Sequence, residues 1–471
     1  MENRKKVAVV GGGPGGYIAA IRAAQLGAEV TLIERGTLGG TCLNVGCIPT
    51  KSIIHSAELY SEIRDRGAQL GIESEGLRLN FARVMAQKDD TVKRLVGGVS
   101  GLIALNKIKV VKGEASFAED GRLSVRKEDG SDVLADCDAI ILAAGSKSFI
   151  PPIEGIGECS ACMDSTGALS LKELPKTMIV IGAGVIGLEI ACAYANFGTE
   201  ITIIEAMDHA LPMMDRDISN IAVRHLKQIG AKIYLGATVL SVSESDKGAI
   251  VTYRNDRQEI LNCEAEKVLV AVGRRADTVS LRLEAAGIEN RQGRIVVDSH
   301  MRTNRENIYA IGDCVFGHAM LAHTASRMGE VAAENIMGIE SVYDETTCPS
   351  CVYMEPEAAS VGLREDQLEK GTYKVGTFPM YANGKAMIMN GGEGMVKILA
   401  DAENEVILGV HIAGPRAADL ISEGAVAIRM GMTADQLIDT IHSHPTISET
   451  VREAALDLQE RALSMPPKRR K

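Results

Sequence analysis

The chain has 471 residues, a length that corresponds to about three domains. Its net charge of −11 and its aromatic content of 3% argue against a nucleic-acid-binding surface. No apolar run approaches the roughly 20 residues that a membrane-spanning helix needs. Ten cysteines, with no leader-like segment ahead of the first strand-like run, favour a cytoplasmic location, where a close cysteine pair is more often catalytic or metal-binding than structural.

A dinucleotide-binding fingerprint opens the chain. A strand-like run at residues 7–10 leads into a helical pattern and then a second strand at 29–33, which ends in Glu34. Three glycines in the G-x-G-x-x-G frame join the first strand to the helix: Gly11, Gly13 and Gly16. Such glycines admit a pyrophosphate to the helix N-terminus, and the acid accepts hydrogen bonds from a ribose. The complete order predicts a nucleotide site rather than an ordinary glycine-rich turn.

Two cysteines follow in a glycine-rich stretch. Residues 39–51 read G-G-T-C-L-N-V-G-C-I-P-T-K, with Cys42 and Cys47 separated by four residues. Pro49 suits the first turn of a helix, which places Cys47 near a helix N-terminus, where a thiolate is favoured. Lys51 adds positive charge within one turn. We therefore predict a redox-active pair in preference to two buried structural thiols.

The fingerprint returns in the middle of the chain. A strand at 179–181 and a helix reaching residue 195 precede a strand at 201–204, which ends in Glu205. The second set of glycines is Gly182, Gly184 and Gly187. Two complete copies, each with its acid at the same spacing, predict two dinucleotide sites, one for FAD and one for a nicotinamide nucleotide. The carboxylate of Glu205 accepts from a ribose 2′-OH and repels a 2′-phosphate, which favours NAD over NADP.

Further glycines stand at the ends of predicted strands. Gly113 lies between the two fingerprints, and a strand at 139–142 leads to Gly145. After the second fingerprint, a strand at 268–272 leads to Gly273. The carboxyl ends of parallel strands form the edge at which ligands bind, so we expect these glycines to border the nucleotide sites.

The character of the chain changes from about residue 341. Predicted strands (358–361, 395–399, 406–411) mix with predicted helices (417–430, 434–437), and no further fingerprint occurs. The region ends in H-S-H-P-T-I-S-E, in which His444 and Glu449 form a candidate acid/base pair, because a carboxylate can orient and charge a histidine. The basic tail at 466–471 is predicted to be a disordered, solvated terminus.

Two other cysteine pairs have C-x-x-C spacing, Cys159 with Cys162 and Cys348 with Cys351. Four thiolates could bind zinc, but the pairs are far apart in the sequence and lie in different predicted domains. For Cys348 and Cys351, buried, inert thiols are the favoured interpretation, and a minor redox-sensitive site is the alternative.

Over essentially its whole length the sequence resembles the pyridine nucleotide-disulfide oxidoreductases, and within them the enzymes that oxidise dihydrolipoamide. The residues that carry the resemblance are the cysteine stretch, the two fingerprints, N-I-Y-A-I-G-D at 307–313 and H-P-T-I-S-E at 444–449. A strand is predicted at 307–311, within the third of these motifs. The resemblance implies an α/β fold with two doubly wound, Rossmann-like nucleotide-binding domains and a C-terminal α+β dimerisation domain. The implied limits are 1–148 with 276–340 for FAD, 149–275 for NAD, and 341–471 for the interface.

The resemblance also implies roles for single residues. Cys42 and Cys47 would form the redox-active disulfide, with Cys42 attacked by the substrate thiol and Cys47 nearer the flavin. His444 would be the acid/base and Glu449 its partner. Three more roles concern the cofactor sites: Asp313 at the ribityl chain, Ala322 beside the flavin at the start of a helix predicted at 320–337, and Lys51 near the flavin, paired with Glu189.

The implied activity is the NAD-linked oxidation of protein-bound dihydrolipoyl groups by a homodimer that serves 2-oxoacid dehydrogenase or glycine cleavage complexes. A lipoyl-bearing carrier protein would be its partner. The alternatives are another FAD-dependent disulfide or mercuric reductase, and a flavoprotein kept as a docking subunit. Two departures from the family pattern are Ala276 in place of a proline and the Cys348–Cys351 pair in place of apolar residues.

Overall fold

The computed structural model describes residues 4–466 and falls into two compact units. The first unit combines the chain up to Ile53 with Ala82–Phe149 and Gly273–Glu345. The second combines Ile54–Phe81, Ile150–Val272 and the chain from Thr346 onward. This division is coarser than the three predicted domains, whose limits stay a prediction. The basic run at 467–471 lies outside the described residues.

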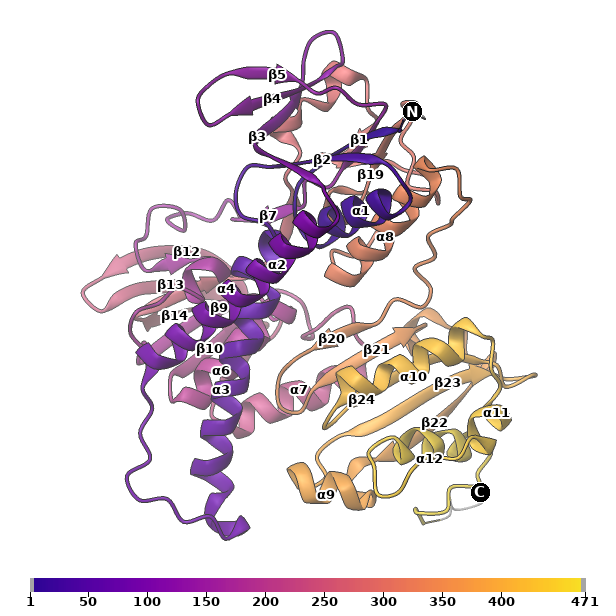
Figure 1. Ribbon diagram of the computed structural model, residues 1–471. Helices are drawn as coiled ribbons and strands as arrows, with labels where there is room; N and C mark the ends of the chain where they lie inside the picture. The colour runs from indigo at the N-terminus through magenta and orange to yellow at the C-terminus, as the bar shows by residue number, and fades with distance from the viewer. Residues whose placement is uncertain (1–3, 467–471) are drawn as a thin grey trace. The chain divides into compact units, whose positions relative to one another are not determined.

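A seven-stranded sheet forms the centre of the first unit (Figure 1). Its strands, in spatial order, are β19 (Ile308–Ala310), β6 (Ala139–Leu142), β1 (Lys6–Val10), β2 (Glu29–Glu34), β3 (Lys109–Phe117), β4 (Leu123–Lys127) and β5 (Asp132–Leu134). The strands from β19 to β3 are parallel, whereas β4 and β5 continue the sheet antiparallel. Because the parallel part is buried on both faces, its central strands are apolar along nearly their whole length.

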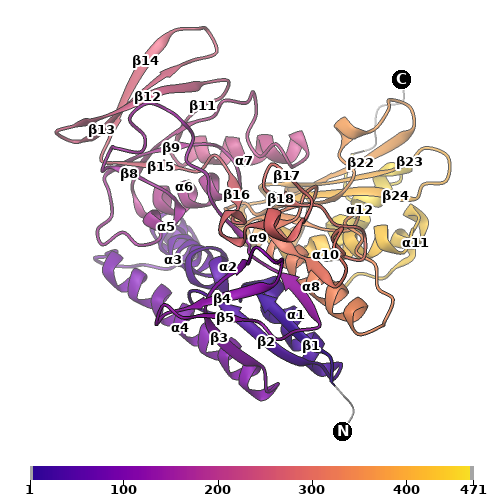
Figure 2. The ribbon, with the colours of Figure 1, turned by 90° about the horizontal axis from the view of Figure 1, so that it is seen from above.

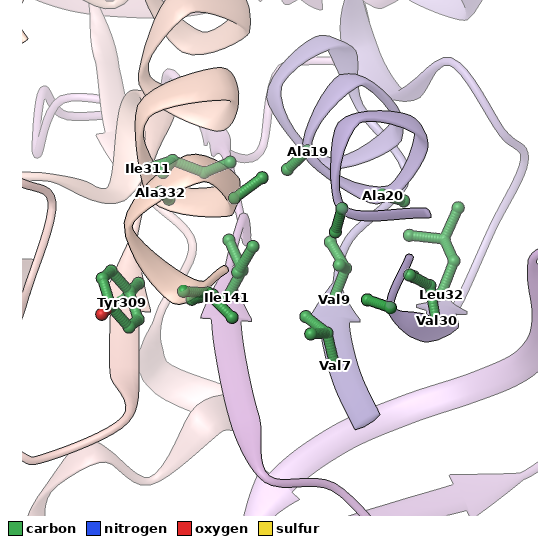
Figure 3. Packing of buried hydrophobic residues seen from close by; sticks show 14 of the residues in the cluster. Val7, Val9, Ala19, Ala20, Val30, Leu32, Ile141, Tyr309, Ile311 and Ala332 are labelled. Carbon is green, nitrogen blue, oxygen red and sulfur yellow. The ribbon is translucent and has the colours of Figure 1, made fainter. Parts of the chain in front are cut away.

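Helices α1 (Pro14–Gln25) and α8 (Ala322–Ile336) pack together on this sheet. Figure 3 shows Val9 and Ile141 of the strands pointing toward the helices that carry Ala19 and Ala332. Small residues let the two helices approach closely, since a Cβ at Gly329 would lie 2.6 Å from a backbone oxygen of α1. Helices α2 (Gly40–Val45) and α4 (Phe81–Leu105) lie in this part of the chain, and α3 (Cys47–Arg66) begins in the first unit and continues into the second.

The second unit contains a parallel sheet that repeats the start of the first. Its order is β11 (Lys232–Tyr234), β10 (Glu200–Ile204), β9 (Thr177–Ile181), β15 (Lys267–Val270) and β8 (Cys162–Met163), with helices α5 (Ser165–Ala168), α6 (Val185–Phe197) and α7 (Arg216–Gln228). Lys6 of β1 lies opposite Glu29 of β2, and Thr177 of β9 lies opposite Glu200 of β10, so the two fingerprints share one register. Figure 2 shows the antiparallel strands β12 (Thr238–Ser245), β13 (Gly248–Arg254) and β14 (Ile260–Ala265) beside this sheet.

An antiparallel sheet with helices on it completes the second unit (Figure 1). Its order is β20 (Ser350–Val352), β21 (Ala358–Gly362), β24 (Ile407–Ala413), β23 (Met395–Asp401) and β22 (Tyr373–Pro379). Its helices are α9 (Gly384–Asn390), α10 (Ala417–Arg429), α11 (Ala434–Asp439) and α12 (Glu449–Leu458). The predicted fold class, two Rossmann-like sheets and a C-terminal α+β region, is confirmed.

The short elements complete the chain. The remaining strands are β7 (Ser146–Ser148), β16 (Arg274–Ala276), β17 (Asn290–Arg291) and β18 (Arg294–Ile295). The 3₁₀ helices are η1 (Gly67–Leu70), η2 (Val279–Leu281), η3 (Leu283–Ala286), η4 (Gly312–Cys314), η5 (Glu365–Gln367) and η6 (Met380–Ala382). Within residues 4–466, no helix is both long and apolar enough to cross a membrane.

Two predicted strands are shorter in the structure. The strand predicted at 307–311 spans only Ile308–Ala310, because Asn307 has a left-handed backbone with φ of 59°. The strand predicted at 268–272 ends at Val270, ahead of Gly273 with φ of 125°. Both corrections concern strand ends, where a turn conformation overrides an apolar run.

Candidate active site

The first and third glycines of each fingerprint are required by the backbone conformation and close packing of the turn. Gly11 and Gly182 both have φ of 103°, a conformation that L side chains rarely adopt. A Cβ at Gly16 would lie 1.8 Å from the carbonyl oxygen of Gly11, and one at Gly187 would lie 2.2 Å from that of Gly182. These four positions therefore keep the strand-to-helix turn tight whether or not a ligand is bound.

Within the described chain, neither backbone conformation nor close packing requires glycine at the middle position of either fingerprint. Gly13 and Gly184 are extended, with φ of −71° and −77°, which other residues adopt freely. A Cβ at Gly13 would come no closer than 3.9 Å to a neighbour, and within the described chain nothing lies within 4 Å of one at Gly184. Among residues 4–466, no side chain caps the N-terminus of α1 or α6. Open space beside uncapped N–H groups fits the diphosphate of a dinucleotide at both turns.

The two acids are held in the same way. Glu34 accepts hydrogen bonds from the backbone N–H groups of Gly12 and Gly36, both at 2.6 Å. Glu205 accepts from those of Ala183 at 2.6 Å and Met207 at 2.8 Å. A carboxylate has about four acceptor positions, so each side chain is fixed against its fingerprint and keeps capacity for ribose hydroxyls.

The cysteine pair lies where two helices meet. Cys42 is in α2, Gly46 separates the helices, and Cys47 is the first residue of α3, which confirms its predicted place at a helix N-terminus. A hydrogen bond with Cys47, followed by burial, raises the pKa of the Cys42 thiol, while the charge of Lys51 acts in the opposite direction. The two sulfurs are thus near neighbours, in a segment whose helix dipole and lysine favour negative charge.

Tyr17 of α1 was missed by the sequence interpretation. Burial, and then the nearby Cys42, raise the pKa of its phenol, so Tyr17 lies close to the cysteine pair. Its position directly after the third fingerprint glycine is the one signal that could have drawn attention to it.

Asp313 belongs to a hydrogen-bonded chain that the sequence interpretation also missed. Ser146 Oγ donates to the carboxylate of Asp313 at 2.5 Å and accepts from Nε of Arg274 at 2.7 Å. Arg274 also donates to the backbone oxygen of Ser146 at 2.7 Å. Both residues stand in segments noted only for their glycines, and the pairing of β7 with β16 brings the two segments together.

Of the other predicted cofactor residues of the first unit, three have places that fit a ligand site, and one glycine is explained by strand packing. Ala322 is the first residue of α8. Gly145 and Gly273 have φ of 71° and 125°, and no atom of the described chain lies within 4 Å of the place that a Cβ would take at either glycine. These two glycines leave room for a ligand. Gly113 differs, because a Cβ there would lie 2.5 Å from the backbone oxygen of Arg126 on the neighbouring strand, so close strand packing accounts for this glycine.

In the second unit, His444 and Glu449 are in contact. Nδ1 of His444 lies 2.9 Å from Oε1 of Glu449, and the backbone N–H of Thr446 donates to Oε2 at 2.9 Å. The imidazole is 81% exposed. Burial alone would raise the pKa of Glu449, but the Thr446 N–H, His444 and the charge of His442 together lower it. The carboxylate therefore accepts from Nδ1–H and leaves Nε2 as the exposed basic nitrogen.

Glu189 is buried in α6 and accepts a hydrogen bond from the backbone N–H of Tyr353 at 2.9 Å. Its predicted pairing with Lys51 would join residues of different units and stays a prediction. The first unit thus contains Cys42, Cys47, Lys51 and the residues predicted to hold FAD. The second contains the residues of the second fingerprint, predicted to hold NAD, together with His444 and Glu449.

The two additional cysteine pairs differ in burial, and the thiols predicted to be buried at Cys348 and Cys351 are only partly so. Cys159 is buried, while Cys162, Cys348 and Cys351 are only partly buried. Burial, and then the neighbouring Cys159, raise the pKa of Cys162 to about 12, which makes it a poor nucleophile at neutral pH.

Comparison with known proteins agrees with this geometry. The family model described as pyridine nucleotide-disulphide oxidoreductase matches residues 5–329, and the model for that family's dimerisation domain matches residues 348–455. A dihydrolipoyl dehydrogenase of Geobacillus stearothermophilus is 44% identical over 95% of this chain and 94% of its own. Mitochondrial dihydrolipoyl dehydrogenase 2 of Arabidopsis thaliana is 42% identical over 98% of this chain and 91% of its own.

A solved structure extends the similarity to three dimensions. LpdA of Mycobacterium tuberculosis superposes with a TM-score of 0.88 at 27% identity, covering 96% of this chain and 99% of its own. Both family models and these full-length relatives show that the chain belongs to the pyridine nucleotide-disulphide oxidoreductase family.

Proposed function

We propose that this chain is an NAD-dependent dihydrolipoyl dehydrogenase that oxidises dihydrolipoyl groups carried on another protein. The observation that carries the proposal is full-length similarity, at 42–44% identity, to dihydrolipoyl dehydrogenases from bacteria and plants. The cysteine pair at the start of α3 and the His444–Glu449 contact supply the groups that such a reaction needs. A cytoplasmic location and a lipoyl-bearing partner belong to the same proposal.

The enzyme uses FAD and NAD. The turn at Gly13, Glu34 and the Asp313 chain would hold FAD in the first unit, and the turn at Gly184 with Glu205 would hold NAD in the second. When bound, FAD supplies the redox chemistry that links a two-electron dithiol to a hydride acceptor.

The protein's own residues carry the thiol–disulfide exchange. Nε2 of His444 takes the proton of one dihydrolipoyl thiol, and the thiolate attacks Cys42 of the oxidised pair. The Cys42–Cys47 bond breaks, a bond between Cys42 and the lipoyl sulfur forms, and Cys47 leaves as a thiolate. The second lipoyl thiol then attacks the mixed disulfide, which releases the cyclic lipoyl disulfide and the thiol of Cys42. Two electrons and two protons have passed from substrate to enzyme.

His444 is well suited to this task. An unperturbed thiol has a pKa near 8.5, so only a few per cent is thiolate near neutral pH. Since Glu449 orients Nδ1 and balances the charge that develops on the ring, a proton taken at Nε2 is stabilised as the thiolate forms.

The two cysteines provide the test of this assignment. Cys42→Ser leaves the Cys47 thiolate, and we expect a long-wavelength charge-transfer absorbance from the FAD-loaded enzyme. Cys47→Ser should lack that band. Both variants should lose dihydrolipoamide oxidation. If the two spectra are alike and both variants still turn over, the assignment of the two sulfurs is wrong.

A further inference from the structure

One histidine of the C-terminal loop has no part in the chemistry described so far. His442 stands two residues before His444, between α11 and α12. Its side chain is only 6% exposed, against 81% for His444. Nε2 of His442 lies 2.7 Å from Oε1 of Glu423 on α10, and Nδ1 lies 2.9 Å from the backbone oxygen of Thr440. The ring is therefore fixed at both ends.

The two contacts define the charge of the ring. A backbone carbonyl only accepts, so the Nδ1 that faces Thr440 carries a hydrogen. A carboxylate also accepts, so the Nε2 that faces Glu423 carries a hydrogen as well. An imidazole with hydrogens on both nitrogens is an imidazolium cation. His442 and Glu423 thus form a largely buried ion pair beside the exposed His444–Glu449 pair.

The charged groups around His442 come from two helices. Glu423 of α10, by its hydrogen bond and its charge, raises the pKa of His442, whereas burial and Arg452 of α12 act against it. Arg452 itself donates to the backbone oxygen of Ile438 at 2.8 Å, at the end of α11. The charge of His442 in turn helps to lower the pKa of Glu449. The two histidine–carboxylate pairs are therefore coupled electrostatically.

We propose that His442 is a positioning residue for His444. As an imidazolium held between Glu423 and Thr440, it fastens the loop at 440–448 to α10, so that Nδ1 of His444 stays against Glu449 and Nε2 faces outward. The inference rests on the proposed role of His444 as the base. It assigns His442 no contact with substrate.

Two single variants and one double variant test the proposal in the FAD-loaded enzyme. His442→Gln and Glu423→Gln should each lower kcat for dihydrolipoamide by about tenfold to a hundredfold, the range for a misplaced catalytic group. Electron transfer from NADH to ferricyanide, which does not need the base, should be unchanged. The exposed pair of Asp435 and Arg461 offers a control, and Asp435→Asn should alter neither activity.

The pH profile separates positioning from a general structural role. Because Glu423 keeps His442 charged, Glu423→Gln should move the alkaline fall of dihydrolipoamide oxidation to lower pH. In a His444→Gln background, His442→Gln should cause no further loss, since its effect passes through His444. If His442→Gln does not fold, the Glu423→Gln profile and a Glu423→Gln, His444→Gln double variant decide the matter alone.

Three results would overturn the proposal: unchanged kcat in both single variants, equal losses toward dihydrolipoamide and ferricyanide, or losses that multiply with that of His444→Gln. A fully active His444→Gln enzyme is a different failure. It would remove the base from the proposed function, whatever His442 does.

Discussion

Lys397 is the most deeply buried cation of the antiparallel sheet in the second unit. Its side chain is 2% exposed, and Nζ lies 3.1 Å from Oδ1 of Asp215, which is also 2% exposed. Two further carboxylates, both more exposed than that of Asp215, also approach Nζ. Asp217 lies at 2.8 Å and Glu365 at 2.5 Å. A buried charge with this many partners is tolerated because every partner is present, and removing one leaves an uncompensated charge.

Lys397→Met should therefore destabilise the protein strongly. Asp215 would stay buried without its cation, a loss that typically costs about 3–5 kcal/mol. Lys374→Met is the matched control, because Lys374 and Glu405 form a pair at 2.7 Å with side chains 41% and 20% exposed. Its effect should stay within about 1 kcal/mol. Urea denaturation of both variants measures the difference, and equal midpoints would contradict this account of the network.

At the scale of elements, the fingerprint turns separate structural from ligand-binding glycines. Gly187→Ala should disturb the fold, because its Cβ would lie 2.2 Å from a backbone oxygen. Gly184→Ala fills open space and should leave the thermal midpoint unchanged. It should nevertheless raise the KM for NAD, since the methyl group would occupy the place of the diphosphate. An unchanged KM in a folded Gly184→Ala enzyme would show that the nucleotide lies elsewhere.

We expect Glu205, directly after β10, to set the preference between NAD and NADP. Its carboxylate is fixed by Ala183 and Met207 and would meet a 2′-phosphate with like charge. The wild-type enzyme should prefer NAD to NADP in kcat/KM, and Glu205→Ala should narrow that preference. Steady-state rates with both nucleotides measure this ratio of kcat/KM values. An equal or higher kcat/KM of the wild type with NADP would contradict the prediction.

The elements differ in how well the sequence predicted them. Both fingerprints were predictable because their glycines, apolar strands and acids follow one local rule. Helix α4 was not identified, because Gly97, Gly98 and Gly101 lie within it and glycine weakens a helix signal. Asn307 shows a second limit, since its left-handed backbone shortens a strand without changing the apolar pattern.

The sequence could not predict the side-chain contacts that join segments far apart in the chain. Ser146 and Arg274 are far apart in the chain, and only the pairing of β7 with β16 brings them to Asp313. His442 of the loop at 440–448 and Glu423 of α10 are likewise brought together only by the fold. By contrast, the contact of His444 with Glu449 was predictable, because the two residues flank one short loop.

At the scale of the whole molecule, the match to a dimerisation domain supports a homodimer. Cys42 and Cys47 lie in the first unit and His444 lies in the second, and we propose that His444 of one subunit serves the cysteine pair of the other. Mixed dimers of a Cys42→Ser chain and a His444→Gln chain, each inactive alone, should recover about half of the sites. If such dimers form but stay inactive, each site lies within one chain.

Anaerobic turnover with alternative substrates is the most direct test that this enzyme oxidises dihydrolipoyl groups with NAD. The purified FAD-loaded enzyme is given dihydrolipoamide with NAD, and in parallel NADH with glutathione disulfide or mercuric ion. His444→Gln is the matched control, with an expected loss on the order of 10²–10⁴ toward dihydrolipoamide. We expect rapid NADH formation from dihydrolipoamide and little reduction of the other two acceptors. Efficient reduction of glutathione disulfide or mercuric ion, with slow oxidation of dihydrolipoamide, would contradict it.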